Sequence, residues 1–240
     1  MVFDTAEVYF MIIGDGNVAA DHEFNRLLSM NKSWLHDHWA DSNLHRNPFG
    51  ELTRAERAEV AIVDVEQIAA WVAEQRTAVQ FVGECGRGKT TRMLTLAGLL
   101  PDAVYTYLPE DRPCPPIPEG RVLLIDEAQR LPRRVRHQVF STGLPLVLGT
   151  HRDLVRPLRR QGYTVHTQRI GLGNTPELVC QVLNRRIESS RRGPGPIPEV
   201  TLDFARSLVG RFGTDIRSIE GYLYELVQTQ VIDHGQVRFE

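Results

Sequence analysis

The sequence contains little cysteine, almost no lysine and no long apolar run. Its three cysteines, Cys85, Cys114 and Cys180, are too few and too scattered for a disulfide framework or a zinc site. The longest apolar run, residues 8–13, is far shorter than the roughly 20 residues that span a bilayer. Acidic residues precede this run, which is unlike a signal peptide. We therefore expect a soluble, cytoplasmic protein without membrane insertion.

The scarcity of lysine draws attention to the one lysine that lies among glycines. Only two of the 28 basic residues are lysines, Lys32 and Lys89. Lys89 stands between Gly88 and Thr90, which suggests chemistry that requires a compact ammonium group. The net charge of −2 also conceals an asymmetry, because residues 1–84 carry −8 and residues 85–240 carry +6. Any attraction to nucleic acid should therefore come from the second part.

Apolar and polar residues alternate in a pattern that predicts strands and helices in turn. Short apolar strands are expected at residues 78–82, 104–108, 122–125, 144–148 and 163–170. Helices are expected at residues 54–74, 89–100, 133–140 and 153–161. This order predicts an α/β fold with a parallel sheet and crossover helices. After residue 173 only helices follow, at 175–189, 201–210 and 214–230. We expect an N-terminal extension (1–49), an αβα core (50–172) and a small helical subdomain (173–240).

One glycine-rich segment matches the phosphate-binding pattern G-x-x-x-x-G-K-[ST] in full. The pattern lies between a predicted strand and a predicted helix, where glycines let backbone N–H groups surround a β-phosphate. Lys89 would reach the β- and γ-phosphate oxygens, and the Thr90 hydroxyl would hold Mg²⁺. We assign nucleotide binding to nine consecutive residues: Gly83, Glu84, Cys85, Gly86, Arg87, Gly88, Lys89, Thr90 and Thr91.

A second motif follows the predicted strand at 122–125. It consists of Asp126, Glu127, Ala128 and Gln129. Asp126 would bind the Mg²⁺ ion through water, and Glu127 would orient and deprotonate the attacking water. The alternative is a strand that simply ends in two solvated acids. The adjacent pair also argues against a small-molecule kinase, which needs no separate residue to activate water.

With these two motifs, residues 47–230 resemble the AAA+ ATPases. Within that family the chain is most similar to origin-recognition and transposition- or secretion-type ATPases, whose second motif often has the sequence Asp-Glu-Ala-Gln. The resemblance implies a P-loop NTPase core of three αβα layers with a five-stranded parallel sheet, followed by an all-helical C-terminal lid. It also implies ATP as the nucleotide, with Mg²⁺, and a homo-oligomer.

The resemblance implies roles for further polar residues. At the end of the fourth core strand, Thr150 would sense the γ-phosphate, with His151 as the second choice. At the start of the last lid helix, Arg217 would act as a second sensor of nucleotide. The alternative for each is an ordinary strand end or a surface charge.

Arginines near the end of the helix at 153–161 match the position of the family's arginine finger. Arg159 or Arg160 would reach the site of a neighbouring subunit and offset charge on its γ-phosphate. Arg152 and Arg156 compete for this role, and a solvated helix face is the alternative.

A basic stretch suggests a polyanionic partner. Eight arginines lie between residues 130 and 160, against one acid, Asp153. Such a stretch would bind duplex DNA without sequence preference, although a subunit interface with a solvated surface is the alternative. We therefore expect an ATPase that couples nucleotide state to the assembly or remodelling of a partner, associated with DNA as in transposition or replication. The alternative is a regulator or secretion-associated ATPase that acts on an unknown protein partner.

Two segments outside these motifs carry expectations of their own. Four prolines (Pro113, Pro115, Pro116 and Pro118) should impose an extended loop where the family often has a helix. Near the N-terminus, Trp34, Leu35 and Trp39 would form an apolar face that docks on the αβα core.

Overall fold

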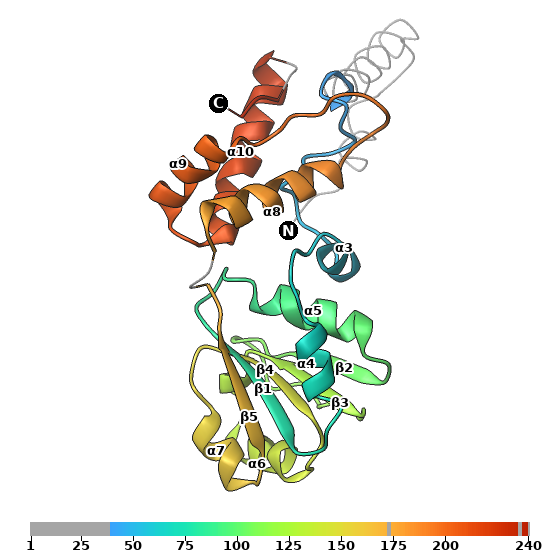
Figure 1. Ribbon diagram of the computed structural model, residues 1–240, viewed down its shortest axis with the longest axis vertical. Helices are drawn as coiled ribbons and strands as arrows, with labels where there is room; N and C mark the ends of the chain where they lie inside the picture. Colours follow the sequence, from blue (N-terminus) through green and yellow to red (C-terminus); the bar gives the residue numbers. More distant parts are fainter. Residues whose placement is uncertain (1–38, 172–173, 235–236, 240) are drawn as a thin grey trace, which may run out of the picture.

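The computed structural model describes residues 39–171, 174–234 and 237–239. The described chain forms two parts, an α/β core and a helical lid above it (Figure 1). Trp34 and Leu35 lie outside the described residues, as does the apolar run at 8–13. No helix within the described ranges is both long and apolar enough to cross a membrane.

The core is built on a five-stranded sheet in which every neighbouring pair is parallel. The strands are β1 (Thr77–Val82), β2 (Ala103–Tyr107), β3 (Val122–Asp126), β4 (Leu146–Thr150) and β5 (Thr164–Arg169), in the order β2-β3-β4-β1-β5. The predicted strands and the α/β fold class are confirmed. Because the strands are parallel, the segments that follow β1, β3 and β4 meet at one edge of the sheet.

Helices cover both faces of this sheet and complete the three layers (Figure 1). On one face, α5 (Lys89–Leu99) buries Met93 and Leu96 against side chains of β1, β3 and β4. On the other face, α6 (Arg133–Ser141) and α7 (Val155–Arg160) bury Phe140 and Leu158. Adjacent residues of β3, such as Leu124 and Ile125, belong to different clusters, as strand alternation requires.

The prediction of one helix over residues 54–74 is wrong. The structure has two short helices, α3 (Arg54–Glu59) and α4 (Glu66–Trp71), separated by residues 60–65. The separating segment is rich in β-branched residues, which are poor helix formers. Asp64 also favours a break, because its Oδ1 accepts a hydrogen bond from the backbone N–H of Glu66 at 3.2 Å.

The expected extended loop between β2 and β3 is confirmed. Residues 113–120 contain neither helix nor strand. Cys114 and Ile117 pack against the core, whereas Pro113, Pro116 and Pro118 are exposed. The inward residues are three apart, which matches the three-residue turn of a polyproline II conformation. A rigid extended segment therefore replaces the crossover helix.

The lid contains α8 (Pro176–Glu188), α9 (Leu202–Phe212) and α10 (Ile216–His234). Its apolar core also includes Leu44 and Phe49, which come from the segment that precedes α3. Trp39 packs against this same cluster, so the expectation that it docks on the αβα core is wrong. By packing, residues 39–50 belong to the lid.

A buried arginine fixes this segment to the lid. Arg186 of α8 donates from Nε to the carbonyl of Pro48 at 2.8 Å and from Nη2 to that of Gly50 at 2.6 Å. Its Nη1 pairs with the Glu220 carboxylate of α10 at 2.9 Å. Burial raises the pKa of Glu220 above its ordinary value, against the opposing effect of Arg186. One side chain thus ties the segment and two lid helices together.

Candidate functional site

The phosphate-binding segment forms the turn between β1 and α5. Gly86 and Gly88 have φ values of 74° and 92°, in the left-handed region that favours glycine. A Cβ on Gly83 would lie 2.6 Å from the carbonyl oxygen of Ile170, so only glycine fits beside the end of β5. The first turn of α5 begins directly after this loop, which orients its free N–H groups toward the loop.

Lys89 is buried inside the loop rather than exposed to solvent. Its Nζ donates to the carbonyl oxygens of Gly83 and Glu84, both at 2.7 Å. Burial lowers the pKa of Lys89, nearby Arg217 acts in the same direction, and the Glu127 carboxylate opposes both. The ammonium group is thus held by loop carbonyls that a phosphate group could replace.

Thr90 and Asp126 meet although 36 residues separate them. The Thr90 hydroxyl donates to Asp126 Oδ2 at 2.6 Å, and the Tyr105 hydroxyl donates to the same oxygen at 3.0 Å. Asp126 is fully buried. Burial and the neighbouring Asp126 raise the pKa of Tyr105 above its ordinary value. A buried carboxylate beside a hydroxyl offers the oxygen ligands that Mg²⁺ prefers, so these residues fit the ion.

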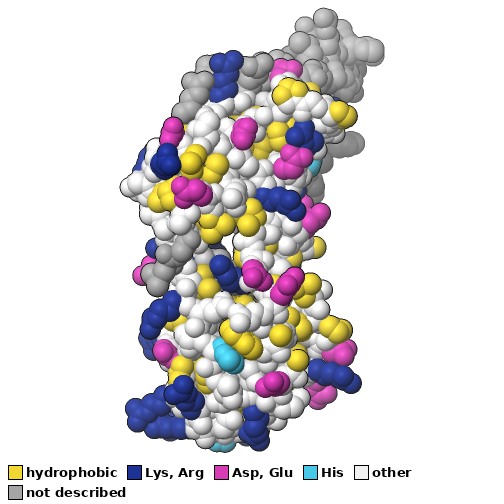
Figure 2. All heavy atoms as spheres, viewed as in Figure 1, with side chains coloured by type: hydrophobic (Ala, Val, Ile, Leu, Met, Phe, Trp, Pro, Cys, Tyr) yellow, Lys and Arg dark blue, Asp and Glu magenta, His cyan; other side chains and the backbone are white. Residues whose placement is uncertain are grey.

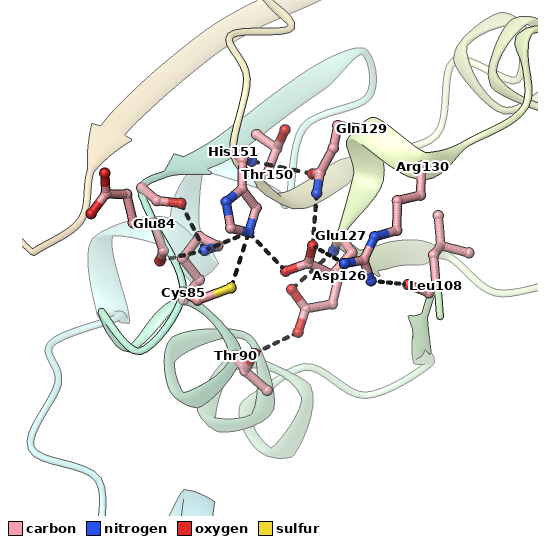
Figure 3. Close-up of polar contacts among 12 residues, drawn as sticks. Glu84, Cys85, Thr90, Leu108, Asp126, Glu127, Gln129, Arg130, Thr150 and His151 are labelled. Atoms are coloured by element: carbon pink, nitrogen blue, oxygen red, sulfur yellow. Dashed lines mark hydrogen bonds and ion pairs between the residues drawn. The ribbon is translucent and has the colours of Figure 1, made fainter. Parts of the chain in front are cut away.

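Glu127 points its carboxylate toward the same space (Figure 3). Its backbone has φ 60°, which is uncommon outside glycine. Oε2 accepts from Gln129 Nε2 at 2.7 Å and pairs with Arg130 at 3.4 Å. Oε1 lies 3.2 Å from His151 Nε2. The buried carboxylate therefore has a fixed position next to the Thr90–Asp126 pair.

At the end of β4 the structure brings His151 into the site and directs the Thr150 hydroxyl elsewhere (Figure 3). Thr150 Oγ1 donates to the carbonyl of Arg152 at 2.8 Å and is fully buried. The His151 ring instead points toward the loop, with Nε2 3.4 Å from Lys89 Nζ and 3.7 Å from Cys85 Sγ. His151, the second choice for the γ-phosphate sensor, thus faces the other site residues, whereas the hydroxyl of Thr150, the first choice, does not.

The lid touches the phosphate loop through the start of α10. A Cβ on Gly86 would overlap the Asp215 carboxylate and would lie 3.3 Å from Arg217 Cβ. Arg87 donates to the Thr214 hydroxyl, which in turn donates to the carbonyl of Gly171 at 3.1 Å. Arg217 therefore lies at the phosphate loop, where the sequence analysis expected a second sensor.

A cavity of about 380 Å³ opens on the β5 side of the loop, where the core joins the lid. Its walls come from α5, the end of β5 and the start of α8, and are formed by Arg92, Gln168, Arg169, Ile170, Gly171, Asn174 and Leu178. Burial lowers the pKa of Arg92.

Arg159 and Arg160 lie far from this site. They are exposed at the end of α7, and β5 begins four residues after Arg160, at Thr164, which pairs with Thr77 at the start of β1. The end of α7 therefore lies at the amino edge of the sheet, opposite the phosphate loop. These arginines cannot act on a nucleotide bound to their own chain.

The basic stretch divides into two kinds of arginine. Arg130 is already engaged, because it bonds to the Leu108 carbonyl, Glu110 and Glu127. The other seven arginines of the stretch form no ion pair with a described residue: Arg133, Arg134, Arg136, Arg152, Arg156, Arg159 and Arg160. The same holds for Arg169, at the end of β5. Figure 2 shows basic side chains gathered at the lower left, over α7.

Three site residues were missed by the sequence analysis. Tyr105 lies on β2, the strand that pairs with β3, and its hydroxyl group reaches Asp126. A polar group on this strand is the feature that could have indicated it. Gln129 belongs to the second motif itself, two residues after Glu127. Arg130 follows directly and was assigned only to the basic stretch. Proximity to the second motif could have drawn attention to Gln129 and Arg130, but the direction of their side chains depends on the turn after β3.

No family model and no curated protein matches the chain. Solved structures match its fold. A variant of Thermotoga maritima RuvB is 20% identical, with a TM-score of 0.53 over 86% of this chain and 70% of that one. The replication initiator DnaA bound to AMPPCP and single-stranded DNA is 14% identical, with a TM-score of 0.51 over 76% and 67%. A DNA replication initiation factor is 13% identical, with a TM-score of 0.51 over 77% and 67%.

These solved structures are AAA+ P-loop ATPases. The fold of this chain, a five-stranded parallel sheet with flanking helices and further helices after it, matches theirs.

Proposed function

We propose that the protein is an ATPase in which Glu127 activates the attacking water. The observation that carries this proposal is the position of the Glu127 carboxylate. It lies beside the Thr90–Asp126 pair and 3.2 Å from His151, whose ring also faces Lys89. A carboxylate next to a phosphate loop and a magnesium ligand pair is the arrangement that water-mediated phosphoryl transfer requires.

Residues of the chain divide the work of binding ATP. Lys89 exchanges the carbonyls of Gly83 and Glu84 for phosphate oxygens, and the N–H groups at the start of α5 contribute further donors. Thr90 and Asp126 hold Mg²⁺, which neutralises phosphate charge when bound. We place the base and ribose in the cavity between the end of β5 and the lid, because it adjoins the loop on the side away from Glu127.

Sensing of the γ-phosphate is assigned to His151 rather than Thr150. The Thr150 hydroxyl already bonds to the backbone of Arg152, whereas the His151 ring faces both Lys89 and Glu127. Arg217 contributes from the lid, and Arg159 or Arg160 contributes from a neighbouring copy of the chain. This division requires a homo-oligomer, because both finger candidates lie at the opposite edge of the sheet.

Steady-state hydrolysis tests the central assignment. Glu127→Gln should bind ATP normally and lose most of its turnover, by about 100-fold or more, because the general base is gone. Fluorescent nucleotide binding and phosphate release measure the two properties separately. Lys89→Ala serves as the blank for hydrolysis. Near-normal turnover by Glu127→Gln would show that another group activates water.

Mixing two inactive variants tests the oligomer. Arg160→Ala retains an intact phosphate loop, and Lys89→Ala retains an intact finger. A mixture should regain part of the activity if the arginine acts between copies. Absence of recovery with each finger candidate in turn would contradict action in trans.

We further propose that the ATPase acts in association with DNA in the cytoplasm, coupling its nucleotide state to the assembly or remodelling of a partner. The arginines of α6 and α7 support this proposal, because they form no ion pair with a described residue and such cations favour phosphate backbones. Two of the structurally similar proteins are a DNA replication initiation factor and a DnaA bound to single-stranded DNA.

The second candidate is an ATPase that acts on another protein, in which the same arginines contact subunits. Hydrolysis with and without duplex DNA distinguishes the two. A DNA-associated enzyme should be stimulated, and its retention on duplex should fall at least about tenfold between roughly 50 and 200 mM salt. Turnover that is unchanged by DNA, and retention on duplex that is unchanged by salt, would favour the protein-directed candidate.

A further inference from the structure

Gln129 joins the two strand ends on which the proposed reaction depends (Figure 3). Its Nε2 donates to Glu127 Oε2 at 2.7 Å, and its Oε1 accepts from the backbone N–H of His151 at 3.2 Å. A carboxamide can do both at once, because its NH₂ group donates while its carbonyl oxygen accepts. One side chain thus connects the end of β3 to the end of β4.

The backbone explains why a residue two positions after Glu127 can do this. Glu127 has a left-handed conformation, and a short 3-10 helix (Ala128–Arg130) follows it. The N–H of Arg130 donates to the Glu127 carbonyl at 2.8 Å and closes the turn. The chain therefore folds back after β3, which brings Gln129 beside the Glu127 side chain and opposite β4.

The other two partners of Glu127 are less able to fix its carboxylate. Arg130 lies 3.4 Å from Oε2, and the same Nη2 lies closer to Glu110, at 2.9 Å. His151 Nε2 faces Glu127, Lys89 and Cys85 at once. A single ring nitrogen either donates or accepts, so it serves these partners only in alternation. Gln129 makes the shortest contact with the carboxylate.

We propose that Gln129 is a positioning residue, which aims the Glu127 carboxylate at the attacking water and ties its position to the end of β4. This inference rests on the proposed ATPase function. The side-chain hydrogen bonds of Gln129 go to Glu127 and His151 and not to Lys89, Thr90 or Asp126, so its role is separable from nucleotide binding. Its loss should reduce turnover and leave the affinity for ATP intact.

Two substitutions of similar size separate aiming from packing. Gln129→Met keeps the length of the side chain and removes both hydrogen bonds. Gln129→Glu keeps the shape and the contact with the His151 N–H, but it cannot donate to Glu127. Each should lower kcat by about 10- to 100-fold, the usual result of a misplaced catalytic group. KM should stay within about twofold, because only an interaction of the reaction step is lost.

Two controls accompany these variants. Gln138→Met changes an exposed glutamine of α6 and should leave kcat unchanged. In the Glu127→Gln background, Gln129→Met should have little further effect, because Gln129 acts only through the residue that is already disabled. Melting temperature and fluorescent nucleotide binding are measured for every variant.

Three results would overturn the proposal. The first is normal kcat in either Gln129→Met or Gln129→Glu. The second is a loss of kcat that only follows a parallel loss of melting temperature and ATP affinity, because that would show a packing role. The third is normal turnover by Glu127→Gln, which would remove the proposed function itself. Loss of turnover in Glu127→Gln with normal turnover in both Gln129 variants would remove this inference alone.

Discussion

The core and the lid contribute to the candidate site in different ways. In the core, side chains that carry chemistry bond to each other across the sheet edge, as Thr90 does to Asp126 and Gln129 does to Glu127. Among the described residues, no lid side chain forms a hydrogen bond or ion pair with those groups. It meets the loop at Gly86 and Arg87, through Asp215 and Thr214. The core thus holds the reacting groups, and the lid rests against the loop that binds phosphate.

The polar interior of the lid serves a different purpose from that of the core. Arg186 pairs with Glu220 and with the carbonyls of Pro48 and Gly50, all away from the phosphate loop. These bonds join chain segments that are far apart in sequence. A buried polar network in the core is available for chemistry, whereas this one gives the lid its cohesion.

The largest expected effect is in the core. Lys89→Ala should lower the affinity for ATP by at least about 1000-fold, because a buried cation that faces the phosphates is removed. Fluorescent nucleotide titration measures the affinity, and Lys32→Ala, a change of the other lysine, is the matched control. Unchanged affinity in Lys89→Ala would contradict the phosphate-loop assignment and the claim that the core holds the reacting groups.

The second prediction concerns the cohesion of the lid. Arg186→Ala should lower the free energy of unfolding by about 2 kcal/mol, because it leaves the partly buried Glu220 and two backbone carbonyls without their partner. Urea unfolding measures this change. The neighbouring exposed residue provides the control, since Arg185→Ala should change stability little. An equal decrease in the free energy of unfolding of the two variants would mean that the Arg186–Glu220 pair stabilises the protein no more than an exposed arginine does.

The smallest expected effect lies where the two parts meet. Arg217→Ala should reduce turnover at saturating ATP by roughly tenfold, since one of several charges near the phosphates is lost. Arg211→Ala, on an exposed part of α9, removes the same charge away from the loop. A loss as large as that of Lys89→Ala would contradict the comparison, because the lid would then bind phosphate as directly as the core does.

The elements of the core were predictable because their signals are local. An unbroken apolar run marked β3, and short, mostly apolar runs marked β1 and β4. The residues of the phosphate loop and of Asp126–Glu127 are consecutive in the chain. A parallel sheet then brings these motifs together, which is why Thr90 and Asp126 meet as expected.

Other features depend on contacts that sequence patterns do not show. Thr150 and His151 are both polar and adjacent, and only the turn after β4 decides which one faces Lys89. The helix expected at 54–74 breaks because β-branched residues and the bond from the Glu66 N–H to the Asp64 side chain outweigh an apolar face. Leu44 packs into the lid across more than a hundred residues, and no local pattern encodes that partner.

The placement of residues 39–50 has a mechanical consequence. Because this segment packs with the lid, the chain passes between lid and core twice, once just after Gly50 and once after Gly171. A body attached at one point can swivel in any direction, but two attachments define an axis between them. A rotation of the lid about that axis would change the distance between the start of α10 and Gly86, which are in contact in this structure.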